Sequence, residues 1–191
     1  VNVNGGTVHA NDAVAQTAIA DATTAYNALA GLAFDTNLTG QVMGSPGLAT
    51  LTPGVYRFDT SAQLTGTLVL DFLSNPGGNF VFQIGSTLTT ASDSFISVLN
   101  ASAGSGIYWQ IGTSATLGTG TDFAGNLLAL TSVTLNDGAQ NFGTSLGDAG
   151  SLGFSGGPLA PVTPVPEPTT AMLFLAGLTG LAATRMKRSA A

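Results

Sequence analysis

The sequence predicts a mainly β protein: a β-solenoid of short strands with one long α-helix packed alongside, and a separate hydrophobic helix at the C-terminus. Three observations predict this fold class. Strand-like runs are separated by Gly, Asn, Asp and Pro, parts of them repeat at a period in the twenties, and the composition changes abruptly after residue 155. Strand-rich self-similarity of this period is typical of solenoids, in which each coil stacks on the last.

The composition limits the classes of protein to which this chain can belong. Its 191 residues are 44% hydrophobic and only 7% charged, and they include no Cys. There is enough apolar material for a folded core, whereas disulfides, Cys-ligated zinc, iron–sulfur clusters and thiol nucleophiles are excluded. Among residues 1–164, Arg57 is the only Lys or Arg, whereas nine of the ten Asp and Glu residues of the chain fall in this range. We therefore expect no nucleic-acid partner.

The helix is expected at about residues 11–30. This segment is rich in Ala and contains neither Gly nor Pro, while Asn11 or Asp12 can cap its start and Gly31 can end it. Apolar side chains recur at intervals of three and four residues, which predicts a wide apolar stripe that covers one flank of the coil and adds to its core. The stripe consists of Val14, Ala18, Ala22, Ala25 and Leu29.

Strands are expected from residue 51 onwards, and the clearest are 54–58, 67–70 and 79–84. Because successive side chains of a strand point to opposite faces, alternate apolar residues should form ladders inside the solenoid. The inward set is expected to be Phe80, Phe82, Ile84, Ile107, Trp109, Ile111, Leu128 and Leu130.

Two sequence matches indicate the repeat. Residues 80–85 (FVFQIG) match residues 107–112 (IYWQIG) at an offset of 27, and residues 87–93 match residues 116–122 at an offset of 29. Both matches end in Gly or Asp, which are common at the tight corners of a coil. They predict that equivalent strands of adjacent coils lie side by side.

The C-terminal region is a linker followed by a hydrophobic segment. Residues 156–168 hold five of the eight prolines and predict an extended linker. Residues 169–184 carry no charge over 16 residues, just short of the ~17–25 of a membrane-spanning helix. Cations directly after an apolar segment stay on the cytoplasmic side, which places the rest of the chain outside the membrane. This basic stop consists of Arg185, Lys187 and Arg188.

The order of motif, apolar helix and basic cluster resembles the PEP-CTERM sorting signal of exopolysaccharide-producing Gram-negative bacteria. The motif residues are Val165, Pro166, Glu167 and Pro168. The resemblance implies transient recognition by an exosortase-type membrane protease and cleavage in or near Pro-Glu-Pro; the alternative is a retained anchor. Both predict an exported, extracellular or cell-surface protein. The expected domains are a solenoid over 1–155, a linker with the motif over 156–168, and the sorting helix with its basic tail over 169–191.

Candidates for catalysis or metal binding are few. His9 is the only histidine and lies at the helix entrance with no partner evident in the sequence. Acids recur about once per strand end, but the G-G-x-G-x-D repeat of calcium solenoids is missing, so turn roles are expected instead. These acids are Asp59, Asp71, Asp93, Asp122 and Asp137. We therefore expect no enzyme, catalytic residue, metal or cofactor, and a carboxylate hydrolase is the weakest alternative.

Threonine is the remaining signal. Residues 60–70, 86–92 and 113–121 are rich in Thr and contain no Lys, Arg, Asp or Glu, although exposed strands normally carry such charges. Thr is also an ordinary exposed strand residue. A rigid array of methyls and hydroxyls can hold water in a lattice-like layer, which favours ice as the ligand. The candidate residues are Thr65, Thr67, Thr87, Thr89, Thr90, Thr113, Thr116, Thr119, Thr121, Thr131 and Thr134.

Several motifs resemble the large microbial ice-binding protein family, among them 51–56 (LTPGVY), 61–68 (SAQLTGTL) and 80–90 (FVFQIGSTLTT). The resemblance spans about residues 2–139. It implies a discontinuous, roughly triangular β-solenoid with a long helix alongside, and ice adsorption through one flat face. Family members have further strands before the position of Val1, so we expect an N-terminally truncated domain. Beyond residue 140, the segment 141–157 has little strand pattern.

The resulting hypothesis is an exported, antifreeze-like protein that adsorbs to ice or ordered water through a flat Thr-rich face. Such adsorption would inhibit ice recrystallisation or attach cells to ice. The alternative is a structural or adhesive protein of the extracellular polysaccharide matrix, in which the same scaffold binds exopolysaccharide and has no ice activity.

Overall fold

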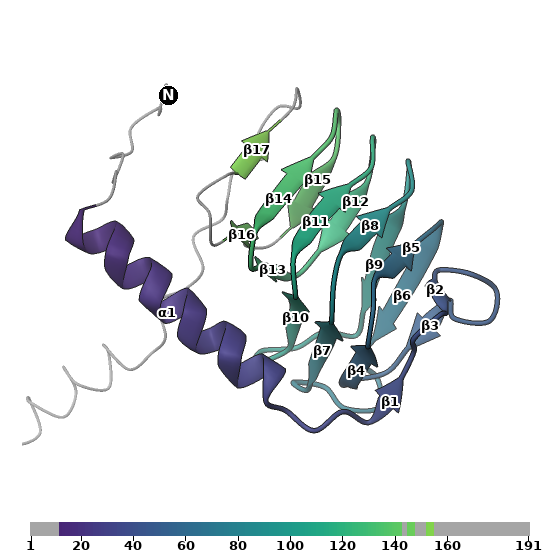
Figure 1. Ribbon diagram of the computed structural model, residues 1–191. Helices are drawn as coiled ribbons and strands as arrows, with labels where there is room; N and C mark the ends of the chain where they lie inside the picture. Colours follow the sequence, from purple (N-terminus) through teal and green to yellow (C-terminus); the bar gives the residue numbers. More distant parts are fainter. Residues whose placement is uncertain (1–11, 143–144, 148–151, 155–191) are drawn as a thin grey trace, which may run out of the picture. The chain divides into compact units, whose positions relative to one another are not determined.

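A computed structural model of the chain describes residues 12–142, 145–147 and 152–154 (Figure 1). The chain divides into two compact units, residues 1–160 and 161–191. The described residues all belong to the first unit and form one helix and seventeen short strands. The predicted linker over 156–168 and the predicted sorting helix over 169–191 lie outside the described residues.

The helix α1 (Ala13–Ala30) confirms the predicted segment. Its N-cap is Asp12, whose side chain accepts a hydrogen bond from the backbone N–H of Ala15 at 3.0 Å. At the other end, the backbone N–H of Gly31 donates to the carbonyl of Asn27 at 3.1 Å. Ala dominates the sequence between these caps, and Ala has the strongest intrinsic preference for the helix.

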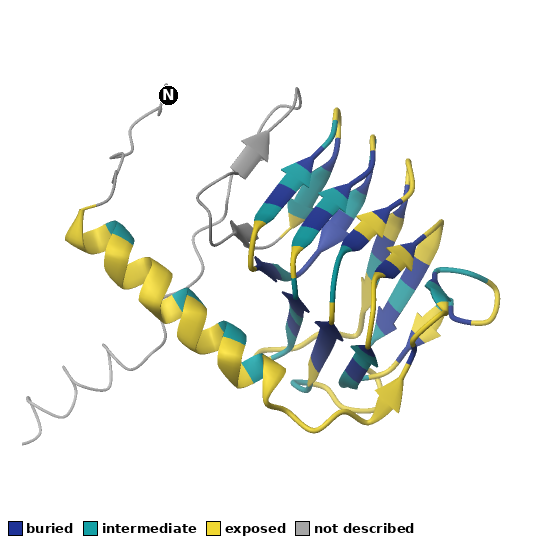
Figure 2. Cartoon of the chain, in the orientation of Figure 1, coloured by how far each residue is buried: buried dark blue, intermediate teal, exposed yellow. Residues whose placement is uncertain are grey.

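The packing of α1 differs from the predicted stripe. No residue of α1 is fully buried, and Val14, a stripe member, is 57% exposed. Two of the five stripe residues, Ala22 and Leu29, have intermediate exposure, as do Ala15 and Tyr26, while Ala18 and Ala25 are exposed like Val14. Figure 2 shows that most of the helix surface is exposed. The helix therefore lies alongside the solenoid but adds little to its core.

The strands form three sheets, and every pairing within them is parallel. Sheet A consists of β1 (Thr36–Asn37), β4 (Gly54–Phe58), β7 (Asn79–Ile84), β10 (Gly106–Ile111), β13 (Asn126–Ala129) and β16 (Ser145–Gly147). Sheet B consists of β2 (Val42–Met43), β5 (Ala62–Leu64), β8 (Leu88–Thr90), β11 (Ser114–Leu117), β14 (Ser132–Leu135) and β17 (Leu152–Phe154). Sheet C consists of β3 (Thr50–Leu51), β6 (Thr67–Asp71), β9 (Phe95–Leu99), β12 (Asp122–Ala124) and β15 (Gln140–Phe142).

The chain visits the sheets in the order A, B, C and then starts the next coil, which confirms the predicted β-solenoid (Figure 1). Because each coil stacks on its predecessor, every inner strand has a partner on both sides, and the backbone hydrogen bonds are satisfied between coils. Three short strands, β15, β16 and β17, also fall in the segment for which the sequence suggested little strand pattern.

The pairing register confirms one predicted repeat and corrects the other. Ile84 pairs with Ile111, at the predicted offset of 27. Thr89 pairs with Thr116, so this offset also holds in sheet B, and the predicted offset of 29 is wrong. In the next coil the offset falls to 18, as the pairing of Ser114 with Ser132 shows. Coil length therefore varies while the strands remain aligned.

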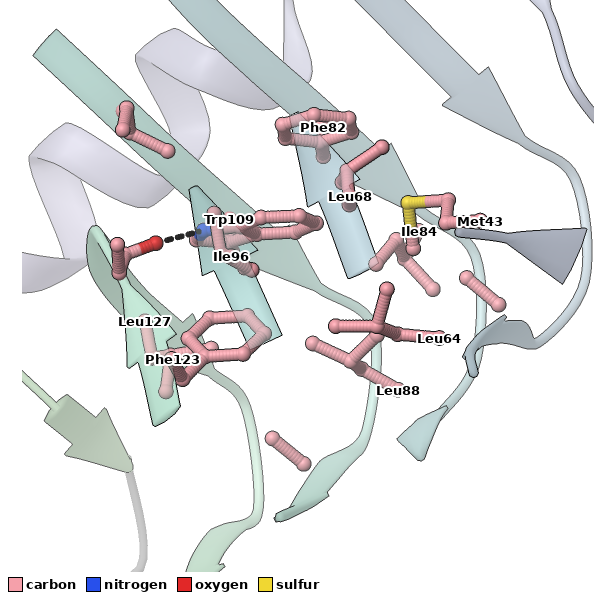
Figure 3. Close-up of a cluster of buried hydrophobic side chains, with 14 of the residues drawn as sticks. Met43, Leu64, Leu68, Phe82, Ile84, Leu88, Ile96, Trp109, Phe123 and Leu127 are labelled. Carbon is pink, nitrogen blue, oxygen red and sulfur yellow. Dashed lines mark hydrogen bonds between the residues drawn. The ribbon is translucent and has the colours of Figure 1, made fainter. Parts of the chain in front are cut away.

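The core lies between the three sheets and is built from apolar ladders. In sheet A, Tyr56, Phe82, Trp109 and Leu127 occupy one register position in four successive coils. Figure 3 shows part of this cluster, in which the Trp109 indole N–H donates to the carbonyl of Ala124 at 3.0 Å. A Trp in a dry core requires such an acceptor for its N–H.

Six of the eight predicted core residues are confirmed as buried inward ladders: Phe80, Phe82, Ile84, Ile107, Trp109 and Ile111. The other two were assigned to the wrong face. Leu127 and Ala129 continue the inward ladders, so Leu128 lies on the outer face of sheet A, and Leu130 follows the strand and is 43% exposed. Four consecutive apolar residues show no alternation, and a shift of one residue reverses the faces of a strand.

The outer face of sheet A carries the contact with α1. The helix lies against β7 and β10. The Nε2 of Gln83 in β7 donates to the carbonyl oxygens of Leu29 at 2.9 Å and Leu32 at 2.8 Å. Leu29 lies in the last turn of α1, where carbonyls have no i+4 partner within the helix, and Leu32 follows the helix, so a side chain from the sheet provides a donor for both.

Candidate functional site

The outer face of sheet B presents two parallel rows of side chains, each running across successive coils. The inner row consists of Ser61, Thr87, Ser114 and Ser132, and the outer row consists of Gln63, Thr89, Thr116 and Thr134. Between them, the inward side chains are apolar and buried, as at Leu88 and Ala115. Alternation along each strand thus separates a hydroxyl-bearing surface from the core behind it.

The hydroxyls of the two rows differ in their hydrogen bonding. In the inner row, Thr87 Oγ1 donates to Ser61 Oγ at 2.9 Å and Ser132 Oγ donates to Ser114 Oγ at 3.2 Å. In the outer row, the threonine hydroxyls make no hydrogen bond to another group within the described part of the chain. The inner row is therefore partly bonded to itself, and the outer row presents free hydroxyls and methyls to solvent.

The outer face of sheet B is uncharged over residues 61–64, 88–90, 114–117 and 132–135. Neighbouring strands in a sheet lie about 4.8 Å apart, and alternate residues of one strand lie about 6.6 Å apart. The rows therefore form a two-dimensional array of small side chains with a fixed repeat. No long or charged side chain interrupts the array over β8, β11 and β14.

Two predicted threonines lie at the corner between sheets A and B. Thr113 and Thr131 are exposed and stacked, because the N–H of Thr131 donates to the carbonyl of Thr113 at 2.8 Å. The stacking is close: a Cβ added to Gly112 would collide with the carbonyl oxygen of Gly85 in the preceding coil. Glycine is required there, and the corner continues the edge of the sheet B surface.

Three further predicted threonines are exposed but lie beyond the two rows. Thr65 and Thr119 lie at the corner between sheets B and C, and Thr67 belongs to β6 on the face of sheet C. In its register, Thr67 pairs with Phe95 rather than with another hydroxyl residue. The structure thus does not bring Thr67 together with the rows of sheet B.

The prediction was wrong for Thr90 and Thr121. Both were expected at the surface, but both are buried, with exposures of 3% and 0%. The N–H of Gly118 donates to Thr90 Oγ1 at 2.8 Å, and Thr121 Oγ1 donates to the carbonyl of Ala91 at 3.1 Å. The two hydroxyls are 2.7 Å apart, so Thr90 must donate to Thr121. This chain of bonds fixes the corner between sheets B and C, and neither residue can contact a ligand.

The candidates drawn from the sequence do not include the serines of the inner row, Ser61, Ser114 and Ser132, because those candidates rest on the enrichment in threonine. A signal was present, since each of these serines precedes a small or apolar inward residue by one position. The pairing register was needed to show that they lie in one line with Thr87.

Two of the five recurrent acids, Asp59 and Asp71, hold groups together at the coil corners. Asp59 accepts hydrogen bonds from Arg57 Nε at 2.6 Å and Asn37 Nδ2 at 2.7 Å, and these two groups hold its pKa below the ordinary value. Asp71 accepts from Asn100 Nδ2 at 2.7 Å and from the N–H of Leu73 at 2.9 Å, which likewise lowers its pKa. Each carboxylate joins groups from adjacent coils or holds a turn.

No cluster of three or more His, Asp or Glu that could hold a metal occurs in the described part of the chain. Within the same residues, no helix is long and apolar enough to cross a membrane. His9 lies outside the described residues. So do the motif Val165, Pro166, Glu167 and Pro168, and the basic residues Arg185, Lys187 and Arg188.

The fold and this face together define a class: a parallel β-solenoid protein with an uncharged outer surface of hydroxyls and methyls on one sheet. The chain belongs to the Ice-binding-like family, which residues 1–155 match. Residues 164–189 match the PEP-CTERM protein-sorting motif, which implies an exported protein sorted to the cell surface and processed by an exosortase. Family membership also supports the expectation of a binding protein rather than an enzyme.

Similar proteins from several organisms are named ice-binding proteins. An ice-binding protein of Nostoc sp. (strain HG1) is 53% identical over 148 residues, which cover 77% of this chain and 54% of the relative. A solved ice-binding protein of Antarctomyces psychrotrophicus is 32% identical with a TM-score of 0.69, over 75% of this chain and 70% of that one. An ice-binding protein from an Arctic yeast is 29% identical with a TM-score of 0.63, over 80% and 64%. The chain spans about half the length of the Nostoc relative.

Proposed function

We propose that this chain is an exported ice-binding protein that adsorbs to ice through the outer face of sheet B. The observation that carries the proposal is the outer row, in which Thr89, Thr116 and Thr134 lie in register with free hydroxyls on an uncharged sheet. The names of the relatives support ice as the ligand.

The chemistry of the surface suits ordered water. Each threonine offers a hydroxyl that can replace a water in a hydrogen-bonded lattice and a methyl around which water can order. A charged side chain would hold its own hydration shell and disturb such a layer. The inward ladders and the bonds within the inner row keep the array rigid, so little conformational entropy is lost on adsorption.

The corner threonines Thr113 and Thr131 extend this surface at one edge, and Thr65 and Thr119 flank the other. Thr67, on sheet C, is left out of the proposed contact, as are the buried Thr90 and Thr121. Adsorption would stop growth of the covered ice front, which inhibits recrystallisation around the cell. Before release from the membrane, the same contact would attach the cell to ice.

The test is ice-affinity partitioning of the full chain, combined with thermal hysteresis, for the wild type and Thr116→Tyr. Thr116 lies at the centre of the outer row, so a ring there would hold a flat lattice away from the sheet. Thr67→Tyr is the matched control, because it places the same ring on sheet C. We expect the wild type and Thr67→Tyr to enter growing ice and Thr116→Tyr to be excluded, with unchanged circular dichroism for all three.

A folded wild type that ice excludes would reject the proposal. In that case, binding to exopolysaccharide would be measured next. Loss of ice binding in Thr67→Tyr but not in Thr116→Tyr would instead move the contact to sheet C.

A further inference from the structure

The outer row changes character at one coil. It carries threonine in β8, β11 and β14, but in β5 the equivalent residue is Gln63. Its neighbours Ala62 and Leu64 are buried and pair with Leu88 and Thr90, so the backbone at Gln63 has the same register and facing as at Thr89. Only the side chain differs.

The inner row, by contrast, continues through the same coil. Thr87 Oγ1 donates to Ser61 Oγ at 2.9 Å across β8 and β5. The flat frame therefore extends one coil further than the threonines do, and Gln63 is exposed upon it.

Glutamine at this position opposes a lattice-like water layer in two ways. It is longer than threonine, so its amide stands above the level of the neighbouring methyls. It also has more rotatable bonds, and fixing it against a surface costs more conformational entropy than fixing a β-branched threonine. A flat ligand that covers Thr89 must displace Gln63 or stop before it.

We infer that Gln63 marks the boundary of the ice-contacting surface and limits its extent along the solenoid. The inference rests on the proposed function. It gives Gln63 a role in the strength of adsorption, because a threonine in its place would complete an outer row of four residues on a backbone that is already aligned.

The experiment compares Gln63→Thr, Gln63→Ala and the wild type by partitioning into ice and thermal hysteresis at equal protein concentration. Gln140→Thr is the matched control, since Gln140 belongs to β15 on sheet C. Burial of one additional methyl against an ordered surface predicts a gain of about fourfold in affinity for Gln63→Thr. Gln63→Ala should give a smaller gain, and Gln140→Thr should give none. Threonine favours exposed strands, so the fold should be retained, which circular dichroism checks.

Two results would overturn the inference while leaving the proposed function intact. If Thr116→Tyr abolishes adsorption and Gln63→Thr equals the wild type, the contact ends before β5 for another reason. If Gln63→Ala weakens adsorption, Gln63 is itself a contact residue rather than a boundary. A wild type excluded from ice rejects the proposed function itself.

Discussion

The ring of Trp109 lies parallel to that of Phe82 in the preceding coil, with centroids 3.8 Å apart and planes inclined by 7°. This stacked pair is the centre of the ladder that begins at Tyr56, whose ring is stacked on Phe82 at 5.5 Å. Gly125 makes room for the indole, since a Cβ there would lie 2.7 Å from Trp109 Nε1. The sequence of aromatic residues at one register position thus fixes how adjacent coils stack.

Replacement of Trp109 by Phe should lower the free energy of unfolding by about 2–4 kcal/mol. The smaller ring leaves a cavity and removes the donor to the carbonyl of Ala124. Urea unfolding measures the change. Tyr108→Phe is the control, because Tyr108 points to the outer face of the same strand and should cost less than Trp109→Phe. An equal cost for both variants would contradict the assignment of faces.

Thr89→Val and Thr90→Val should affect different properties, although the residues are adjacent: Thr90→Val should lower stability, and Thr89→Val should lower ice adsorption. Thr90→Val removes the acceptor of the Gly118 N–H inside the corner, which should lower the free energy of unfolding by about 1–3 kcal/mol. Thr89→Val removes an exposed hydroxyl, so its stability should stay within about 0.5 kcal/mol of the wild type while ice adsorption falls. Thermal unfolding and ice partitioning together separate the two roles, and a stability loss in Thr89→Val alone would be the contrary result.

Stability should fall on acidification through Asp59 and Asp71. In the folded chain, the hydrogen bond from Arg57 lowers the pKa of Asp59, and that from Asn100 lowers the pKa of Asp71. A lowered folded pKa means that the stabilisation is present above the unfolded value of about 4 and is lost as pH falls through the folded values.

The urea midpoint at pH 7 and at pH 3 tests this pH dependence. The double variant Asp59→Asn and Asp71→Asn should show a smaller change between the two pH values than the wild type. An undiminished change would assign the acid sensitivity to other carboxyls.

Gln83→Ala should loosen the last turn of α1. Its amide donates to the carbonyls of Leu29 and Leu32, and both would lose a protein partner. Hydrogen exchange at the C-terminal turn of α1 should accelerate, while exchange in sheet B stays slow. Gln110→Ala is the matched control, because Gln110 pairs with Gln83 in the next strand. Equal acceleration in both variants would show that general loosening of sheet A is the cause.

The sequence was sufficient for the helix because its signals are local. Asp12 and Gly31 limit an Ala-rich segment that contains no breaker, and each acts on backbone groups within four residues. The strands 54–58 and 79–84 were also predictable, since alternation and flanking turn residues agree there. The 27-residue repeat was visible because its match includes five strand positions and a corner glycine.

What the sequence could not supply was the facing of particular residues. Thr89 and Thr90 are the same residue type, and only their position in the alternation of strand faces distinguishes them. The pairing of Thr90 with the buried Leu64 shows that Thr90 is the inward residue. The apolar run 127–130 likewise shows no alternation from which the inward residues could be read. The predicted offset of 29 was wrong because it aligned identical residues of two Thr-rich segments. The backbone pairing instead aligns Thr89 with Thr116, at an offset of 27.

Coil length varies most at the connection from sheet C to sheet A, and less at the connection from sheet B to sheet C, which has two residues at 65–66 and six at 44–49. The connection from sheet C to sheet A spans residues 72–78 and 100–105 in two coils but only Gly125 in a later one. The connections from sheet A to sheet B stay at two to four residues, as at 38–41, 59–61, 112–113 and 130–131. Because the variable corner joins the two sheets other than sheet B, insertions and deletions there leave the spacing of the hydroxyl rows unchanged. Residues can therefore be inserted or removed at this corner without altering the proposed ice-contacting face, and the same corner is a suitable place to graft a reporter peptide.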